Sequence, residues 1–249
     1  NARKRPGTPG ALLVLSYSDV LLASTVSGRF LDPPSRLGEN HVVATDVLVR
    51  VSGLRKAFGG HRVLDGVTLE VRSGEAVALL GANGAGKTTL LRILATLARP
   101  TRGTAWVAGH DCARDPERVR PHIGLVAHGS YVYEDLTALE NLKFWTGLAG
   151  LRVSRRELAA ALAAVELERF AGERVRTFSA GMKRRLSLAR FVLARPRVLL
   201  LDEPFAGLDQ RAKKWLEEHL ESFKAGGGAI VMATHSFGRE LAVADRIAL

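Results

Sequence analysis

Apolar and polar positions alternate with two different periods along this chain. Residues 47–51 and 67–71 alternate apolar and polar side chains, which predicts half-exposed strands of an antiparallel layer. Three other runs are almost continuously apolar, as expected for parallel strands that are covered on both faces. These runs are residues 76–80, 198–201 and 229–233. The pattern predicts an α/β fold in which helices wrap a mostly parallel sheet.

Helical periodicity dominates a long stretch between two of these apolar runs. Two capping boxes punctuate it, Thr137 with Glu140 and Ser154 with Glu157, and each pairs an N-cap hydroxyl with a carboxylate three residues later. We therefore expect an inserted α-helical subdomain at about residues 129–194. Farther along, Asp209 is placed to cap a helix that runs to about Lys224.

The two ends of the chain differ from its middle. Residues 1–45 are punctuated by glycine, proline and serine, which predicts a poorly ordered N-terminal extension. The apolar stretch at 11–23 superficially resembles a signal peptide, but polar residues interrupt it, and we favour a protein that is not exported. Residues 46–249 form the expected domain. Residues 245–249 begin another strand, so we also expect that the C-terminus is truncated.

The overall charge raises two classes of partner without deciding between them. The net charge of +11 at pH 7 is compatible with nucleic acid or an anionic membrane surface. The clusters Arg3-Lys4-Arg5 and Lys183-Arg184-Arg185 are predicted to be solvated, and we expect no nucleic-acid partner because no interleaved aromatic pattern accompanies them. The single cysteine, Cys112, cannot form an internal disulfide, and we expect it to be a small, partly buried apolar residue.

The clearest chemical signal is the run from Gly81 to Thr88, which fits G-x-x-x-x-G-K-[ST]. It follows an apolar strand and precedes a helical pattern that starts at Thr89. Such a loop gathers backbone N–H groups around phosphate oxygens, while the lysine neutralises charge and the hydroxyl offers an oxygen to Mg²⁺. The sequence thus predicts a phosphate-binding loop for ATP with Mg²⁺, formed by Gly81, Asn83, Gly84, Gly86, Lys87, Thr88 and Thr89.

A second signal is the apolar strand that ends in two carboxylates, Asp202 and Glu203. At the carboxyl end of a parallel strand, Asp202 is placed to hold Mg²⁺ and Glu203 to polarise an attacking water. Taken alone, the pair is explained equally well as two acidic residues in the turn that ends the strand, without a role in catalysis. Its combination with the phosphate-binding loop favours the catalytic interpretation.

Further motifs follow in a fixed order. Residues 178–182 read F-S-A-G-M ahead of an amphipathic helix, residues 207–209 read G-L-D, and His235 follows the last apolar strand. With Phe58 ahead of the loop, residues 46–249 resemble the ATP-binding cassette (ABC) family. The resemblance implies a P-loop NTPase fold with a RecA-like core, an antiparallel β layer and the inserted helical subdomain.

The resemblance also implies roles for individual residues. Phe58 would stack on adenine, His235 would contact the γ-phosphate and order the water beside Glu203, and Lys87 would share in catalysis. Ser179 and Gly181 would bind the ATP held by a second subunit in a head-to-tail dimer, which Asp209 would couple to the opposite site. Taken singly, Phe58 and His235 fit equally well as ordinary core or surface residues, and Asp209 as a helix cap.

The chain departs from the family pattern at two places. Most members carry a glutamine after the strand that precedes residue 128, where this chain has His128. An imidazole differs from an amide in reach and in titratable charge, so a metal-binding role for His128 is in doubt. The family signature has the form L-S-G-G-Q and corresponds to residues 178–182, where Ala180 and Met182 replace the first glycine and the final glutamine.

A finer resemblance concerns the segment from Gly124 to Trp145, including L-T-A-L-E-N-L-K-F. It is similar to the haem-exporter ATPases of cytochrome c maturation, the CcmA group. Exporter ATPases for drugs or polysaccharides and soluble non-transport ABC ATPases are the alternatives. The resemblance implies a peripheral subunit on the cytoplasmic face of the cell membrane, docked on an integral membrane permease through candidates among Tyr131, Tyr133, Phe144 and Trp145. Core packing is equally compatible with Phe144 and Trp145.

Overall fold

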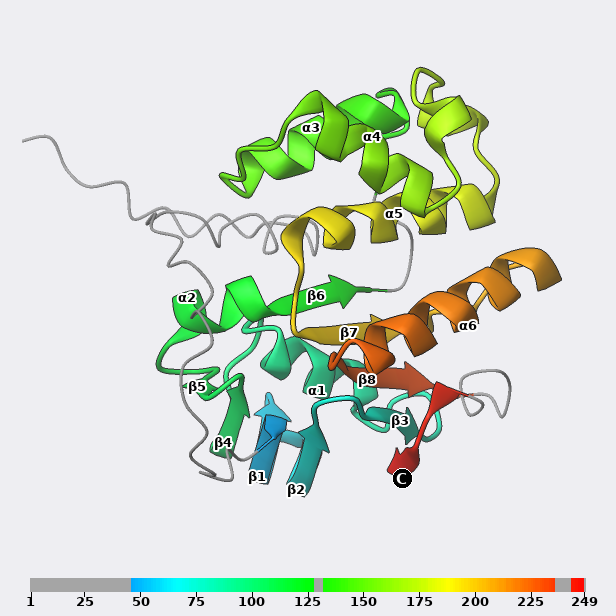
Figure 1. The fold of residues 1–249 in the computed structure, drawn as a ribbon. Helices are drawn as coiled ribbons and strands as arrows, with labels where there is room; N and C mark the ends of the chain where they lie inside the picture. Colours follow the sequence, from blue (N-terminus) through cyan, green and yellow to red (C-terminus); the bar gives the residue numbers. More distant parts are fainter. Residues whose placement is uncertain (1–45, 128–131, 236–242, 249) are drawn as a thin grey trace, which may run out of the picture.

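Two sheets organise the residues that the computed structural model describes, which are 46–127, 132–235 and 243–248. The first sheet is antiparallel and has the strand order β2-β1-β4-β5 (Figure 1). The antiparallel strands predicted at residues 47–51 and 67–71 are confirmed, because these residues pair with one another, for example Val51 with Leu69. The alternation is interrupted in the first strand, where Leu48 and Val49 are both buried beside a register shift. The strands of this sheet are β1 (Val47–Phe58), β2 (His61–Arg72), β4 (Arg102–Val107) and β5 (His110–Asp111).

The second sheet is parallel and has the order β6-β7-β8-β3-β9. The three continuously apolar runs are its central strands, and every residue of these strands is buried, as predicted. The strand expected near the C-terminus is also present and pairs with β3. The strands are β3 (Ala76–Leu80), β6 (Ile123–Val126), β7 (Val198–Asp202), β8 (Ala229–Thr234) and β9 (Arg246–Ala248).

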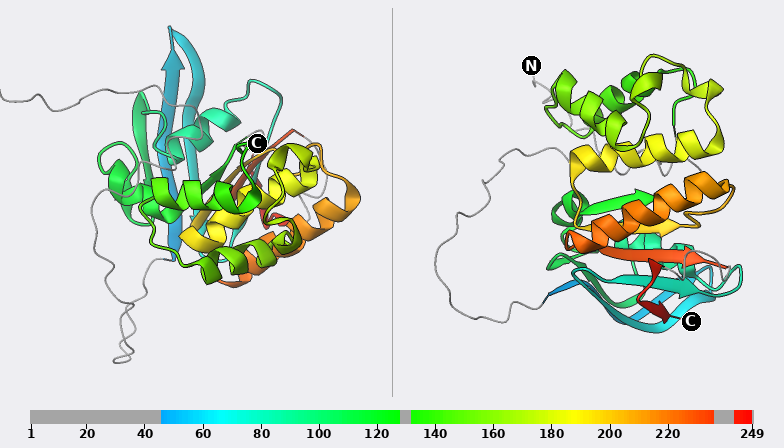
Figure 2. Two further views of the ribbon diagram at one scale, coloured as in Figure 1. Left: turned by 90° about the horizontal axis from the view of Figure 1, so that it is seen from above. Right: turned by 45° about the vertical axis from the view of Figure 1, so that its right-hand side comes forward.

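Helices cover the parallel sheet and form a block beyond it. In Figure 1, α5 lies between the parallel sheet and the pair α3 and α4, and the turned view in Figure 2 shows the same layering. Both predicted capping boxes are formed, and Asp209 caps α6. The helices are α1 (Lys87–Leu94), α2 (Pro116–Val119), α3 (Ala138–Leu148), α4 (Arg155–Ala164), α5 (Ala180–Ala194) and α6 (Gln210–Ala225), with 3-10 turns η1 (Arg120–His122), η2 (Glu168–Phe170) and η3 (Val175–Thr177).

Two hydrophobic clusters hold these layers together. One lies between the two sheets around α1 and contains fully buried Ile93 and Leu94. The other lies between the parallel sheet and the helices α3 to α6 and contains Leu142, Leu162 and Trp145. Each fully buried aliphatic side chain contributes roughly 1.5–3 kcal/mol through the hydrophobic effect. The helical block is therefore packed onto the sheet through a core of its own.

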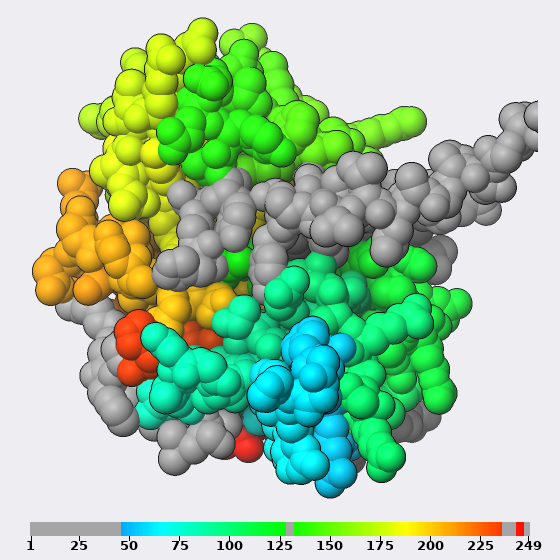
Figure 3. Space-filling view, turned by 180° about the vertical axis from the view of Figure 1, so that it is seen from behind, coloured from blue at the N-terminus to red at the C-terminus, as the bar shows by residue number. Residues whose placement is uncertain are grey.

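Trp145 is only 2 % exposed, so it packs in this second core and is not available to a docking partner. The ring of a residue on the inward face of a helix is covered by the core, so a partner protein cannot contact it. Tyr133 and Phe144 are exposed on the same block. The space-filling view in Figure 3 shows this block at one end of the molecule and the residues of β1 and β2, in blue to cyan, at the other.

Several predictions concern residues outside the described part of the chain. The N-terminal extension at 1–45, including Arg3-Lys4-Arg5, is among them, as are His128 and Tyr131. The bounds of the two predicted domains stay a prediction. In the part of the chain that the structure describes, no helix has both the length and the apolar character to cross a membrane.

Candidate functional site

The phosphate-binding loop joins the carboxyl end of β3 to the first residue of α1. Gly86 has φ 92° at the N-cap of α1, and a Cβ built there would lie 2.7 Å from the Val63 carbonyl oxygen. Only glycine fits this conformation and this approach. Lys87 Nζ donates to the carbonyl oxygens of Gly81, at 2.6 Å, and Ala82, at 3.1 Å. The lysine ammonium is therefore held over the loop itself.

The loop is accessible from outside the molecule. Asn83 and Gly84 are exposed, and Gly84 has φ 87°. Thr89 is half-buried one residue beyond Thr88, in the first turn of α1. Unpaired backbone N–H groups at a helix start attract an anion, so this geometry suits phosphate.

Thr88 and Asp202 meet although they are far apart in the sequence. The Thr88 hydroxyl donates to Asp202 Oδ2 at 2.9 Å, across the carboxyl ends of β3 and β7. Asp202 is 7 % exposed and is the last residue of β7. A hydroxyl and a carboxylate are the hard oxygen donors that Mg²⁺ prefers, and Mg²⁺ usually takes only one or two protein ligands beside phosphate oxygens. The donor set therefore fits the predicted metal.

Glu203 and His235 form a second pair at the same edge. His235 Nδ1 lies 2.7 Å from Glu203 Oε1, which joins the end of β7 to the residue after β8. The Glu203 side chain is largely buried, whereas the His235 side chain is 56 % exposed. The structure thus brings together four predicted residues, Thr88, Asp202, Glu203 and His235, at the carboxyl edge of the parallel sheet.

The backbone at Glu203 is in the left-handed region. Its φ is 49°, a conformation that costs a residue with a Cβ about 1–2 kcal/mol. The Glu203 N–H donates to the Ala233 carbonyl oxygen at 2.9 Å, so the neighbouring strand β8 helps to hold it. This conformation turns the chain sharply directly after Asp202.

The cluster Lys183-Arg184-Arg185 is not the solvated face that its charge predicts. Lys183 pairs with Glu134 at 2.5 Å, and Arg185 pairs with Glu166 at 2.8 Å. Arg184 is buried, at 6 % exposure, and donates to the carbonyl oxygens of Glu203 and Ala127. The sequence signal was its position three residues after Gly181, which places it on the inward face of α5.

Phe58 ends β1 and is half exposed, with the Lys56 ammonium 4.5 Å from its ring centroid. Strand pairing places Phe58 opposite His61, two residues before Val63. Because Val63 touches Gly86, this hairpin end lies beside the phosphate-binding loop. An exposed ring there is available to stack on a base, and stacking on adenine stays a prediction.

Ser179, Gly181 and Asp209 gather at the starts of α5 and α6. Ser179 Oγ accepts from the Met182 N–H at 3.2 Å, and Asp209 Oδ1 accepts from the Ala212 N–H at 2.8 Å. A Cβ on Gly181 would lie 2.9 Å from Ala212 Cβ. The two hydrogen bonds each cap their own helix, and the close approach of Gly181 to Ala212 brings the starts of α5 and α6 together. Their predicted role toward a second copy is untested by these contacts.

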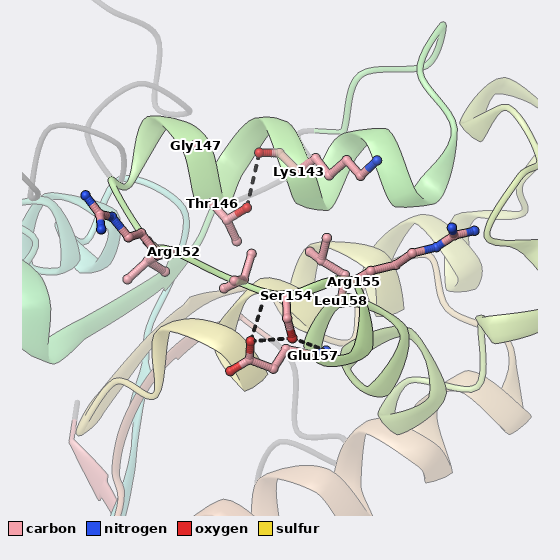
Figure 4. Close-up of a pocket in the computed structure, with 10 residues that line it drawn as sticks. Lys143, Thr146, Gly147, Arg152, Ser154, Arg155, Glu157 and Leu158 are labelled. Atoms are coloured by element: carbon pink, nitrogen blue, oxygen red, sulfur yellow. Dashed lines mark hydrogen bonds between the residues drawn. The ribbon is translucent and has the colours of Figure 1, made fainter.

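A separate hollow of about 670 Å³ lies in the helical block, between the end of α3 and the start of α4 (Figure 4). Lys143, Arg152 and Arg155 line it, but Figure 4 shows the ends of Arg152 and Arg155 directed to opposite sides. Glu157 is turned back to the Ser154 N–H, and none of the predicted nucleotide-binding residues lines this hollow.

Comparison with known proteins agrees with this arrangement. Residues 64–206, more than half of the chain, match the family described as ABC transporter. The chain belongs to the ABC transporter ATPase family. A solved ATP-binding subunit of an ABC transporter shares 33 % sequence identity, with a TM-score of 0.71 over 80 % of this chain and 83 % of that one. An ATP-binding cassette solved in its ADP conformation shares 21 % identity and the same TM-score of 0.71, and it supports the fold alone. The predicted P-loop NTPase fold is confirmed.

Curated relatives of this ABC ATPase domain are named for resistance and export. The daunorubicin resistance ATP-binding protein DrrA3 of Streptomyces coeruleorubidus is 37 % identical over 82 % of this chain and 65 % of its own length. The doxorubicin resistance ATP-binding protein DrrA of Mycobacterium tuberculosis is 39 % identical, over 82 % and 63 % respectively. The Nod factor export ATP-binding protein I of Ralstonia nicotianae is 37 % identical, over 78 % and 61 %. The chain thus spans less than two thirds of the length of these relatives.

Proposed function

We propose that this chain is the ATP-hydrolysing subunit of a membrane exporter. The observation that carries the proposal is the meeting of Thr88 with Asp202 and of Glu203 with His235 at one edge of the parallel sheet. A phosphate-binding loop, two metal-binding oxygens and a carboxylate held by a histidine are the parts that phosphoryl transfer from ATP to water needs. Family membership supports the assignment.

Each residue contributes a separate part of the reaction. The backbone N–H groups of the loop and Lys87 would bind and orient the β- and γ-phosphates. Thr88 and Asp202 would hold Mg²⁺, which supplies charge neutralisation on the phosphates when it is bound. Glu203 would take up the proton of the attacking water, and His235 would keep its carboxylate directed at that water. General-base catalysis of this kind contributes about 10²- to 10⁴-fold in rate.

We further propose that the active form is a head-to-tail dimer. Ser179 and Gly181 lie at the start of α5, where a second copy's γ-phosphate would meet the Ser179 hydroxyl and the helix N-terminus. Asp209, at the start of α6, would couple the two sites. The close packing of Gly181 against Ala212, whose amide donates to Asp209, supports a shared surface at the starts of the two helices.

The exporter would take a small organic compound, because relatives are named for daunorubicin or doxorubicin resistance and for Nod factor export. The drug-exporter alternative fits these names, and haem export is not supported by them. The subunit would sit peripherally on the cytoplasmic face of the membrane. Tyr133 and Phe144 are exposed, and their rings are in edge-to-face contact with centroids 4.6 Å apart. We propose that these two rings anchor the subunit to a permease.

ATP turnover and nucleotide-dependent dimerisation test the enzymatic part of the proposal. Lys87→Ala should abolish Mg²⁺-dependent hydrolysis, measured as phosphate release. Glu203→Gln should still bind ATP but hydrolyse it at least about 100-fold more slowly, and it should elute as an ATP-dependent dimer. If Lys87→Ala hydrolysed ATP at the wild-type rate, the assignment of residues 81–88 as the phosphate-binding loop would be contradicted. A Glu203→Gln protein that stays monomeric at saturating ATP with Mg²⁺ would contradict the shared site.

Purification of the full-length protein from detergent-solubilised membranes of its own cell tests the transport part. A multi-spanning permease identified by mass spectrometry, without haem absorbance, is the expected result. A permease that copurifies with haem and haem-handling proteins would restore the haem-export hypothesis. Recovery with ribosomes, nucleic acid or soluble assembly factors, and without a permease, would contradict the exporter.

A further inference from the structure

Arg184 is a buried arginine whose two terminal nitrogens reach different parts of the backbone. Nη2 lies 3.2 Å from the Glu203 carbonyl oxygen, and Nη1 lies 3.4 Å from the Ala127 carbonyl oxygen. Its side chain comes from α5, and only 6 % of the residue is exposed. A guanidinium is costly to bury, so its contacts must compensate for the lost hydration.

The two carbonyl groups end neighbouring strands of the parallel sheet. Ala127 follows β6 and Glu203 follows β7, and these strands pair in register, with Val126 opposite Leu201. One guanidinium thus spans the gap at the carboxyl edge where the candidate site lies. Its planar fork presents donors in fixed directions, which a lysine ammonium cannot reproduce.

The positive charge of Arg184 interacts with the negative charge of Asp202, the candidate metal ligand. Burial lowers the pKa of Arg184, and the nearby Asp202 carboxylate acts in the opposite direction. A guanidinium keeps its proton in proteins, so Arg184 is a cation next to Asp202. By comparison, Arg190 on the same helix donates to the Leu125 carbonyl oxygen, within β6, at 2.8 Å. Arg190 contacts the middle of a strand, whereas Arg184 contacts the catalytic edge.

Glu203 needs such support because its backbone is in the left-handed region, with φ 49°. A non-glycine residue keeps this conformation only where its surroundings fix it. The hydrogen bonds of Glu203 do so: its amide donates to Ala233, its carboxylate meets His235, and its carbonyl oxygen accepts from the Ala206 amide and from Arg184. Arg184 supplies the contact that comes from the helical block.

We propose that Arg184 is a positioning residue that links the start of α5 to the orientation of the Glu203 carboxylate. This inference rests on the proposed ATPase function. Ser179 caps the helix on which Arg184 lies, five residues earlier, a span of about 7.5 Å along an α-helix. A nucleotide bound at Ser179 by a second copy would move α5 as a unit, and Arg184 would transmit that movement to Glu203.

Kinetics of the full-length protein with Arg184→Met and Arg184→Lys test the inference. Arg184→Met should lower kcat by about 10- to 100-fold, the range for a lost charge-assisted hydrogen bond. KM and the affinity for a fluorescent ATP analogue should stay within about threefold, because the phosphate-binding loop is untouched. Arg184→Lys keeps the charge and should recover part of kcat. Arg185→Met, on the same helix but paired with Glu166 and not with the ends of β6 and β7, is the matched control and should retain wild-type kcat.

A double-variant cycle separates positioning from a structural role. In a Glu203→Gln background, Arg184→Met should cause little further loss in single-turnover rate, since the carboxylate that it positions is already absent. A multiplicative loss would overturn the inference, as would an unchanged kcat in Arg184→Met. If circular dichroism shows that Arg184→Met does not fold, Arg184→Lys decides, and wild-type kcat in that variant refutes the inference. If instead the wild-type protein did not hydrolyse ATP, or Lys87→Ala hydrolysed it equally well, the proposed ATPase function itself would be contradicted.

Discussion

Gly86→Ala is a substitution in the phosphate-binding loop for which the structure gives a definite expectation. Gly86 has φ 92°, and an added Cβ would lie 2.6 Å from Leu64 Cδ2 and 2.7 Å from the Val63 carbonyl oxygen. The left-handed backbone costs a residue with a Cβ about 1–2 kcal/mol. The backbone oxygen cannot move aside as a flexible side chain would, and such overpacking adds about 1–3 kcal/mol. We expect a total loss of about 2–5 kcal/mol in the free energy of unfolding.

Gly84→Ala is the matched control in the same loop. Gly84 has φ 87°, but an added Cβ would meet no atom within 4 Å. This variant should lose only the backbone contribution, about 1–2 kcal/mol. The difference between the two variants isolates the contact with β2. For a domain of this size it corresponds to a difference in Tm of roughly 2–12 °C.

The assay is thermal and urea unfolding of the nucleotide-free proteins, followed by circular dichroism. Nucleotide is left out so that contacts with phosphate do not enter the comparison. Equal Tm values for Gly86→Ala and Gly84→Ala would refute the argued contact between the loop and the β1–β2 hairpin. A Gly84→Ala protein as stable as the wild type would show that the backbone strain is overestimated.

Three further predictions concern stability and reactivity. Thr137→Ala breaks the capping box of α3 and should lower the free energy of unfolding by about 0.5–2 kcal/mol in urea titrations. Burial raises the pKa of Cys112 to about 12, so its thiol should resist iodoacetamide at pH 8 until urea unfolds the protein; rapid native labelling would contradict this. Burial opposes the charge of Asp245, but hydrogen bonds from the Ala76 amide and Lys224 outweigh it and lower its pKa. Asp245→Asn should therefore reduce the Tm at pH 7 and progressively less below about pH 4, where the wild-type carboxylate also becomes protonated; an equal effect at all pH values would refute the linkage.

The strands were predictable because each sheet has its own burial pattern. A strand with one exposed face alternates, as in β1 and β2, whereas a strand covered on both faces is continuously apolar, as in β3, β7 and β8. Capping boxes are equally local, since Thr137 and Ser154 act within three residues. Both kinds of signal depend only on residues that are close together in the sequence, so they can be recognised without the structure.

The surroundings of the site were harder to predict. The charge of Lys183-Arg184-Arg185 indicated a solvated face, but Arg184 is buried against two strand ends and its neighbours pair with Glu134 and Glu166. Trp145, a candidate for docking, lies in the second core. In both cases the outcome depends on which side of a helix faces the sheet, and on residues distant in sequence.

The sequence by itself determined the identity of the chemical groups and their order along the chain. A loop such as Gly81–Thr88 needs glycines, a lysine and a hydroxyl at fixed spacing, and that requirement is local. Only the tertiary structure decided which groups meet: Thr88 with Asp202, His235 with Glu203, and Arg184 with the ends of β6 and β7. Parallel strands place all their carboxyl ends at one edge, so residues that are separate along the chain become neighbours there.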